Sequence, residues 1–359
     1  MSSSWKTWVG IAISLAAIWW SVQGVDWSAV GTALRRADYG LLALVFVLAA
    51  LINVGARAIR WRILLLPTGR VPIGSLVSAT AIGLMANNVL PARVGEFVRA
   101  YALGKKEKVP VGTAFGSLFV ERMFDGFALV GIVYALTRIH DFPGWVDTTV
   151  EVALYLFLGF LAFQVWLLFR AHRFIAFVKW VSEKFFGGRF AEPIERALVA
   201  FVDGFHLLKR PWLVAASFLL AIVQWSLIAF TFWLGLAAFD LLAPTGVTGS
   251  LFVTSVVALG VAVPSSPGFV GTFQALVVKS LEVFGVARTP AFTFSIGFHA
   301  VNYLSVTAVG LWYFFREGLS WSELEHSEEE LERELEEEFE TEIEPALEKR
   351  EQVGAEERD

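Results

Sequence analysis

The apolar positions of this chain gather in long runs that short polar stretches separate. Because a helix of about 20 residues crosses a bilayer, six runs are predicted to be spanning helices, at 7–23, 40–60, 112–137, 150–170, 212–237 and 291–315. Two further runs, 73–104 and 249–284, are interrupted in the middle by proline, glycine and polar residues. The halves of these two runs are too short to span comfortably.

Basic residues flank the first interrupted run on both sides. The positive-inside rule places such flanks in the cytoplasm, so this run is predicted to enter and leave on one side, as a re-entrant hairpin. The flanks of the second interrupted run, 238–248 and 285–290, hold Arg288 as their one basic residue, so this run is predicted to enter from the outside. Both termini are then cytoplasmic, whereas Arg35 and Arg36 fall outside, against the rule. The basic flanks of the first run are Arg57, Arg60, Arg62, Arg70, Lys105, Lys106 and Lys108.

The eight segments follow one order that occurs twice. Span, span, hairpin and span begin near 7, 40, 73 and 112, and the same order begins again near 150, 212, 249 and 291 with opposite topology. Inverted repeats with broken helices are typical of secondary transporters. The predicted fold is an all-α polytopic membrane protein with about six spanning helices and two re-entrant helical hairpins, in inverted halves at about 1–140 and 150–316.

Composition supports the membrane class and separates a soluble tail from it. Of the 359 residues, 56% are hydrophobic and the mean hydropathy is +0.61, which is more apolar than a soluble domain. Residues 321–359 hold 18 acidic and 4 basic residues, and the rest of the chain holds 16 acidic and 25 basic residues. We therefore expect a membrane transport domain at 1–316 in the cell membrane and an acidic cytoplasmic tail at 317–359. The chain has no cysteine, which excludes disulfides and thiol chemistry.

Three peripheral segments leave alternatives open. The first apolar run lacks a clear small-residue cleavage site, which favours a retained helix over a signal peptide. The acidic tail is disordered or a solvated helix, or else it is a helix that binds a protein partner. Within about 172–210, a helical stripe predicts either an amphipathic helix on the cytoplasmic surface or one packed under the bundle. The stripe consists of Ile194, Leu198, Phe201, Phe205 and Leu208.

The first hairpin contains the stretch NNVLPARVGEFVR at 87–99. Pro91 suits the first turn of a helix, and Arg93 and Arg99 are each three residues from Glu96, within pairing distance on a helix. One acid cannot neutralise two arginines, so a guanidinium is left for an anion such as phosphate; the alternative is a structural ion-pair cluster. The predicted substrate-binding residues are Asn87, Asn88, Arg93, Glu96 and Arg99, and Pro91 and Gly95 are predicted to break the hairpin.

The second hairpin contains VPSSPGFVGTFQ at 263–274. Ser266 is a natural N-cap, Pro267 suits the first helical position, and free N–H groups at such a helix start favour an anion. Two half-helix N-termini that enter from opposite faces are then predicted to converge on one anionic group; the alternative is a broken helix that binds nothing. The predicted substrate-binding residues are Ser266, Gly268, Gly271, Thr272 and Gln274, and Pro264 and Pro267 are predicted to break the hairpin.

A third polar group is ERMFDG at 121–126. Glu121 and Asp125 lie one turn apart with Arg122 beside them, and charge inside a membrane segment is a functional hypothesis by default. These three residues are predicted to form either a proton-coupling site or an ion-pair network. His299, Asn302 and Tyr303 form a weaker polar patch. The sequence has no metal-ligand cluster, nucleotide-binding loop or nucleophile with a His–acid pair, so we expect no cofactor, no metal and no enzyme activity.

The stretches NNVLPARVGEFVRAYAL, ERMFDG and VPSSPGFVGTFQ resemble, in order and spacing, the lysylphosphatidylglycerol synthase transmembrane domain, also called the flippase-like or UPF0104 group. The resemblance covers about 1–316. It implies a module that moves aminoacylated phosphatidylglycerol between leaflets, and archaeal relatives join it to lipid-linked sugar transfer. The soluble synthase domain is not in this sequence, so the transport half is the implied role. Gln274 stands where relatives often carry an acid, which favours a simple anionic lipid. The implied site residues are Asn88, Pro91, Arg93, Gly95, Glu96, Arg99, Glu121, Arg122, Asp125, Pro267, Gly268 and Gly271.

The sequence thus predicts a lipid translocase of flippase or scramblase type. Its expected partner is a membrane phospholipid or a polyprenyl-phosphate lipid, with no nucleic acid; a homo-oligomer is compatible with the sequence. The alternatives are a secondary transporter of a small anionic solute, a membrane enzyme or accessory subunit that acts on lipid-linked sugars, and a scaffold that works through its tail.

Overall fold

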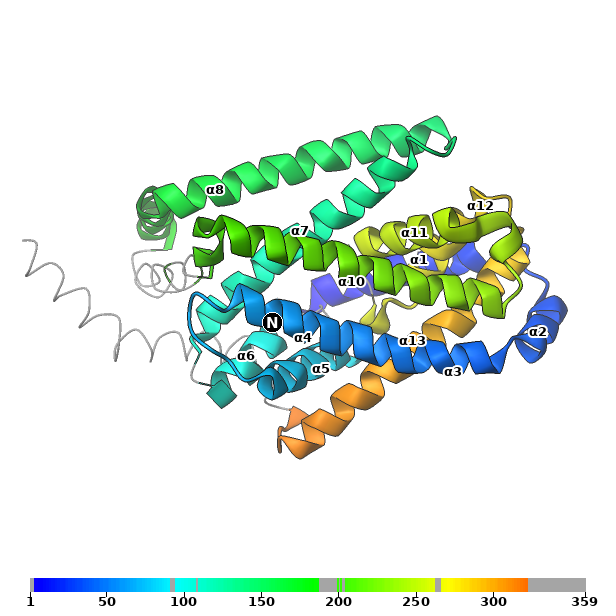
Figure 1. Cartoon of the computed structure of the whole chain (residues 1–359), viewed down its shortest axis with the longest axis horizontal. Coiled ribbons are helices and arrows are strands. Elements are labelled where there is room, and N and C mark those ends of the chain that lie inside the picture. The colour runs from blue at the N-terminus through cyan, green and yellow to red at the C-terminus, as the bar shows by residue number, and fades with distance from the viewer. Residues whose placement is uncertain are drawn as a thin grey trace, which may run out of the picture.

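The computed structural model describes residues 3–90, 94–107, 109–186, 199, 201, 204–261 and 266–321. Every regular element in these residues is a helix, and the long helices pack into one bundle (Figure 1). The helices of the first half are α1 (Ser3–Val22), α2 (Trp27–Arg36), α3 (Tyr39–Ala50), η1 (Leu51–Ala56), α4 (Arg57–Leu64), α5 (Ile73–Val89), α6 (Gly95–Glu107) and α7 (Val111–Leu136). Those of the second half are α8 (Gly144–Phe186), η3 (His206–Lys209), α10 (Pro211–Ala238), α11 (Leu242–Gly260), η4 (Pro267–Phe269), α12 (Thr272–Glu282) and α13 (Arg288–Arg316).

The chain is an all-α polytopic membrane protein. Within the described residues, five helical segments are long and apolar enough to span: Tyr39–Leu64, Gly144–Leu167, Pro211–Ala238, Leu242–Gly260 and Arg288–Arg316. This set differs from the predicted one in three ways. The predicted span at 7–23 is not in it, because the apolar helix there, Ala12–Val22, is too short. Helix α7 is long enough but carries Glu121, Arg122 and Asp125 near its middle, and α11, which we expected to be half of a hairpin, reaches 19 residues.

Helices α5 and α6 form an antiparallel hairpin. Ser75 and Ser78 near the start of α5 bond to Glu107 and Lys106 at the end of α6. Nearer the tip, the absence of a side chain at Gly83 lets the backbones meet, because a Cβ there would lie 2.8 Å from the Cβ of Arg99. The start of α5 and the end of α6, which form the open end of this hairpin, lie at the left end of the bundle in Figure 1.

Helices α11 and α12 form the second hairpin, which opens at the other end of the bundle (Figure 1). Gly260 packs against Leu276 near the tip, and Phe252 packs against Phe284 near the open end, so the arms are antiparallel. The two tips meet: a Cβ at Gly268 would lie 3.3 Å from the carbonyl oxygen of Asn88. The order of elements is the order that the inverted repeat predicts, and the repeat itself stays a prediction.

A six-residue π-helix, η1, interrupts the span Tyr39–Leu64 at Leu51–Ala56. Such π-turns often occur at functional sites because they rotate the residues that follow. Arg57 comes directly after η1 and Arg60 one turn later, and both side chains are buried in the bundle. The prediction that these two arginines belong to a cytoplasmic flank is therefore wrong.

Helix α8 lies along one edge of the bundle (Figure 1), with a kink at Arg170 where φ is −130° and ψ is 26°. Of the predicted amphipathic stripe, Ile194 and Leu198 lie outside the described residues, as does the tail 322–359. Phe201 and Phe205 stack against Phe119 of α7, with ring centroids 5.2 and 6.1 Å apart. For this part of the segment the structure favours packing against the bundle over exposure on its surface.

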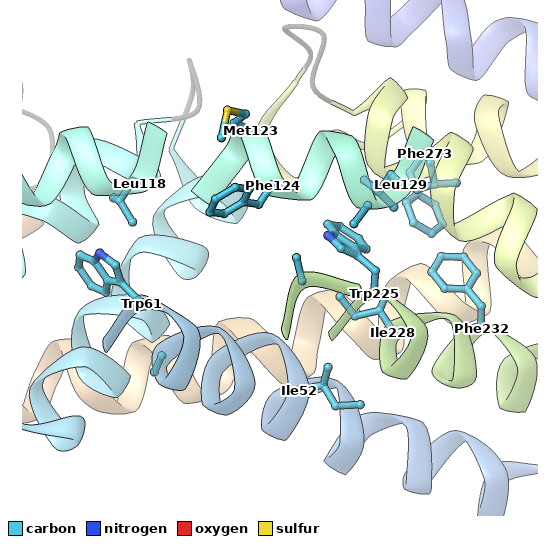
Figure 2. Close-up of a cluster of buried hydrophobic side chains, with 14 of the residues drawn as sticks. Ile52, Trp61, Leu118, Met123, Phe124, Leu129, Trp225, Ile228, Phe232 and Phe273 are labelled. Atoms are coloured by element: carbon cyan, nitrogen blue, oxygen red, sulfur yellow. The ribbon is translucent and has the colours of Figure 1, made fainter. Parts of the chain in front are cut away.

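The core joins both halves. Figure 2 shows Trp225, Ile228 and Phe232 along α10, with Leu129 of α7 and Phe273 of α12 facing them. The large apolar side chains between α7, α10 and the second hairpin hold these helices in one arrangement, because van der Waals contacts stabilise only closely packed atoms.

Candidate functional site

Four arginines from three helices converge on one carboxylate oxygen of α7. The acceptor is Oε1 of Glu121, whose side chain is fully buried. The nitrogens around it are Arg57 Nη1 at 3.2 Å, Arg60 Nη2 at 3.3 Å, Arg99 Nη1 at 3.0 Å and Arg122 Nη2 at 2.6 Å. We call these five side chains, together with Asp125, the arginine cluster.

Asp125 lies one helical turn after Glu121 and joins the same group. Its Oδ1 accepts from Arg60 Nη1 at 2.5 Å and from the indole Nε1 of Trp225 at 2.9 Å. Arg122 Nη2 lies 3.4 Å from Oδ2 of the same carboxylate. The spacing of one turn on α7 puts both carboxylates on one face, where α4, α6 and α10 reach them.

Aromatic side chains hold the arginines in place. The Arg99 guanidinium lies over the ring of Trp61, 4.0 Å from its centroid, as expected for a cation–π contact. Trp61 is itself fixed by a hydrogen bond of 2.8 Å from its Nε1 to Ser117 Oγ on α7. The cluster is thus a rigid junction between the first hairpin and α7.

Positive charge exceeds negative charge in the arginine cluster. Four guanidiniums face two carboxylates, which leaves two positive charges unmatched, since arginine stays protonated in proteins. Among the described residues, the Nε atoms of all four arginines lack a hydrogen-bond acceptor, and Oε2 of Glu121 and Oδ2 of Asp125 lack a hydrogen-bond donor. Unmatched donors and charge of this kind are costly in a membrane interior unless an anion joins them.

A cavity of about 600 Å³ lies beside the cluster. Arg57, Arg122 and Asp125 form part of its wall, together with Glu96 of the first hairpin. Its other polar lining comes from Asn53, Asn87, Asn88, Thr254, His299, Asn302 and Tyr303, and its apolar lining includes Phe157, Phe160, Phe232, Phe269, Phe273 and Phe298. The cavity lining therefore combines charged, amide and aromatic side chains, and both hairpins contribute to it.

Amide side chains cap the short helices at both hairpin tips. Asn87 Oδ1 accepts from Gly95 N at 2.9 Å, and Gln274 Oε1 accepts from Gly271 N at 2.7 Å. Our expectation that free N–H groups at these helix starts receive an anion is wrong for these two groups, because the protein itself satisfies them. Beside the cavity, the described donors without an acceptor include Nε atoms of the arginine cluster.

The structure places the predicted site residues unevenly. Asn87, Asn88 and Glu96 line the cavity with Arg122 and Asp125. Arg99 and Glu121 belong to the arginine cluster behind the wall. Outside the described residues lie Pro91, Arg93 and Pro264. The cavity lining among the described residues does not include the predicted residues of the second hairpin, Ser266, Gly268, Gly271, Thr272 and Gln274.

Two predicted local contacts differ in the structure. Arg99 pairs with Glu121 rather than with Glu96, whose Oε2 accepts from Asn87 Nδ2 at 3.4 Å. Ser266 does not cap a helix with its side chain: its hydroxyl donates to the carbonyl of Val270 at 3.0 Å. For Arg99 a partner on another helix replaces the neighbour on its own helix, whereas Ser266 bonds to a backbone carbonyl four residues further along the chain.

Sequence reasoning missed Arg57, Arg60, Asn53 and Trp225 as site residues. The sequence does contain a signal that Arg57 and Arg60 lie within a span, because the apolar positions around them continue to Leu66, past the predicted end of the span at residue 60. Asn53 and Trp225 stand in apolar runs without any neighbouring charge, and nothing local marks them.

Comparison with known proteins identifies the family. The sequence family described as the lysylphosphatidylglycerol synthase TM region matches residues 7–310. The chain belongs to this family. UPF0104 membrane proteins of Methanocaldococcus jannaschii and Methanothermobacter thermautotrophicus are 24% and 25% identical to it over 76% and 78% of this chain, and over 83% and 84% of their own lengths. No solved structure matches significantly.

Another relative is an enzyme by name. The glycosyltransferase AglD of Haloferax volcanii is 34% identical over 124 residues, which are 34% of this chain and 20% of that protein. The chain thus spans about a fifth of this relative. The prediction that the chain is not an enzyme is wrong on these findings, because a family named for a synthase and a relative named as a glycosyltransferase point to a membrane transferase.

Proposed function

We propose that this member of the lysylphosphatidylglycerol synthase family binds an anionic phospholipid or lipid-linked phosphate in the central cavity and moves it between leaflets, as part of membrane transferase chemistry. The observation that carries this proposal is the unmatched positive charge of the arginine cluster beside a cavity that aromatic side chains also line.

Arg57 and Arg122 are the residues assigned to the phosphate. Both belong to the cluster and line the cavity, and the side chain of Arg122 is 36% exposed. A guanidinium offers paired donors that match two phosphate oxygens, and such charge-assisted bonds are about twice as strong as neutral ones. An anion seated there reduces the charge surplus that the protein leaves uncompensated.

The lipid tail is assigned to the aromatic side chains of the cavity. Phe157 and Phe160 belong to α8 at the edge of the bundle, and Phe232 and Phe273 belong to the core. Acyl or prenyl chains gain free energy against such a surface in proportion to the apolar area covered. The two hairpins enter from opposite ends of the bundle, and both line the cavity.

The test uses purified protein in vesicles that carry a fluorescent anionic lipid in both leaflets. A membrane-impermeant reductant quenches the outer leaflet at once, and the inner leaflet only as lipid exchanges. We expect exchange with the intact chain and its loss in Arg57→Gln and Arg122→Gln. The matched control is Arg138→Gln, whose guanidinium stacks on Tyr134 away from the cavity. Full exchange in folded Arg57→Gln and Arg122→Gln would contradict the proposal.

A second candidate is direct participation in transfer to a lipid-linked substrate, which the match to AglD favours. Its test incubates the purified chain with radiolabelled sugar-nucleotide donors and a prenyl phosphate acceptor, and measures label in the lipid phase. Transfer that depends on Asp125 and Arg122 would support this role; label that never enters the lipid phase would contradict it.

A further inference from the structure

The acidic tail begins on the open end of the first hairpin. Its first residue, Glu317, pairs with Lys106 of α6. Four residues later, the ring of Trp321 packs on Phe314 of α13 with centroids 4.6 Å apart, and Phe314 belongs to an apolar cluster that α13 forms with α5 and α6. The chain thus enters residues 322–359 from a point beside this hairpin.

A hollow of about 240 Å³ lies where the tail meets the hairpin. Glu317 forms part of its wall, where Lys106 Nζ bonds to the carboxylate and lies 3.4 Å from Ser78 Oγ. Lys105 lines the same hollow and is exposed, with its ammonium 5.8 Å from the ring centroid of Tyr101. One acid of the tail is therefore bound here, and a second lysine stands beside it.

Exposed basic side chains dominate the end of the bundle at which the first hairpin opens (Figure 1). They are Arg62, Arg70, Lys105, Lys106, Arg170, Arg173, Lys209, Arg210 and Arg316. Among the side chains that the structure describes at this end, Glu107 and Glu317 are the acids, and Glu107 already bonds to Ser75. An acidic segment at this end therefore meets a surplus of positive charge.

The first half of the tail carries the matching charge. Residues 321–340 hold 11 acidic residues and one basic residue. Glu323 and Glu325 lie within four residues of Trp321, which is a reach of about 14 Å for an extended chain. Anionic lipids compete for the same lysines, but the chain itself holds these acids beside them, at an effective concentration on the order of millimolar.

We infer that the acidic tail docks within its own chain on the basic open end of the first hairpin, with Glu323 and Glu325 at Lys105 and Lys106. The docked tail extends the contact of Glu317 and clamps the end of α6 to the end of α13. This surface lies at the end of the bundle, outside the described lining of the central cavity, so the inference does not rest on the proposed function.

The experiment crosslinks the detergent-purified full chain through a photoreactive benzoylphenylalanine in place of Leu324, which stands between the two acids. Mass spectrometry of the digest identifies the crosslinked residues, and a mixture of isotopically light and heavy chains separates contacts within a chain from contacts between chains. We expect crosslinks within one chain to residues 100–107 of α6. Crosslinks that avoid these residues overturn the inference. Crosslinks that join light to heavy chains assign the tail to a second copy and overturn it as well.

Charge reversal then tests the pairing. Lys105→Glu removes one attraction and adds one repulsion, each worth up to about fivefold for exposed charges, so the crosslink yield at short irradiation should fall by about fivefold to 25-fold. Glu325→Lys in the same chain should restore the yield. The matched control is Arg35→Glu, which reverses an exposed arginine of α2 at the other end of the bundle and should keep the full yield. Equal yields in Lys105→Glu and Arg35→Glu overturn the inference.

Amide exchange gives a second readout that needs no photoreactive group. A docked tail should slow exchange at the end of α6, because it holds the last turn against α13. Glu323→Lys with Glu325→Lys should therefore speed exchange at residues 100–107 and leave exchange in α2 unchanged. Identical exchange at 100–107 in the wild type and this variant overturns the clamp.

Discussion

Replacing Glu121 with glutamine removes the one carboxylate that four arginines share while keeping the shape of the side chain. The four nitrogens lie 2.6 to 3.3 Å from Oε1. At an effective dielectric constant of about 20, each such pair attracts by roughly 5 kcal/mol. The desolvation of the buried ions opposes most of this attraction, and losing one partner of a buried pair typically costs about 3–5 kcal/mol. We expect a free-energy loss at the upper end of that range for Glu121→Gln, because the unmatched charge of the cluster rises from two to three.

The assay heats aliquots of the detergent-purified protein to a series of temperatures. Size-exclusion chromatography with tryptophan fluorescence detection then measures the folded fraction that remains at each temperature, which gives Tm. With an unfolding entropy of about 2.1 cal/mol/K per residue, 1 kcal/mol shifts the Tm of a chain of 359 residues by about 1.3 °C. A loss of about 5 kcal/mol in Glu121→Gln should therefore lower Tm by roughly 6–7 °C. Glu151→Gln, which changes an exposed acid on α8, is the matched control. Arg57→Gln should cost less than Glu121→Gln because it reduces the charge surplus. If Glu121→Gln unfolds within a degree of the wild type, the charge argument is refuted.

Three further predictions concern the scaffold. Gly83→Val should cost about 1–3 kcal/mol by overpacking, since its side chain would meet Arg99 across the first hairpin, whereas Gly74→Ala on the same helix meets nothing within 4 Å and should leave Tm unchanged. The pKa of Asp26 lies below its ordinary value of 3.8 because Ser28 and the N-terminal N–H groups of α2 bond to it. The stabilisation of α2 by this carboxylate is therefore present above pH 3.8 and should be lost as pH falls through the lower folded pKa, which faster amide exchange in α2 would show. Asp26→Ala should remove this pH dependence. Lys106→Ala breaks the partly exposed pair with Glu317 and should change Tm by at most the equivalent of about 1 kcal/mol; a larger loss would make this pair a structural lock.

The hairpins were predictable because proline and glycine interrupt apolar runs whose halves are too short to span. That signal is local and depends on backbone chemistry alone. The caps at the tips were not predictable in the same way. Asn87 reaches Gly95 eight residues on, across the turn, and this contact exists only once the arms have closed. Gln274, by contrast, caps within its own first turn, and its position three residues after Gly271 is a pattern that sequence alone offers.

The misplacement of Arg57 and Arg60 has a physical cause that applies to other membrane chains. The positive-inside rule assumes that arginine near the end of an apolar run reaches water. These two arginines instead find acids 64 and 65 residues further along the chain, and a count along one segment does not register partners on another. The acids themselves give the missing signal: Glu121 and Asp125 stand inside a predicted span, where a carboxylate needs a cation from another helix. If such acids are first paired with the basic residues nearest to other spans, and cytoplasmic flanks are assigned only afterwards, Arg57 and Arg60 are predicted to lie within a span. The same pairing also exposes the surplus of arginine over acid, which is the feature that points to an anionic ligand.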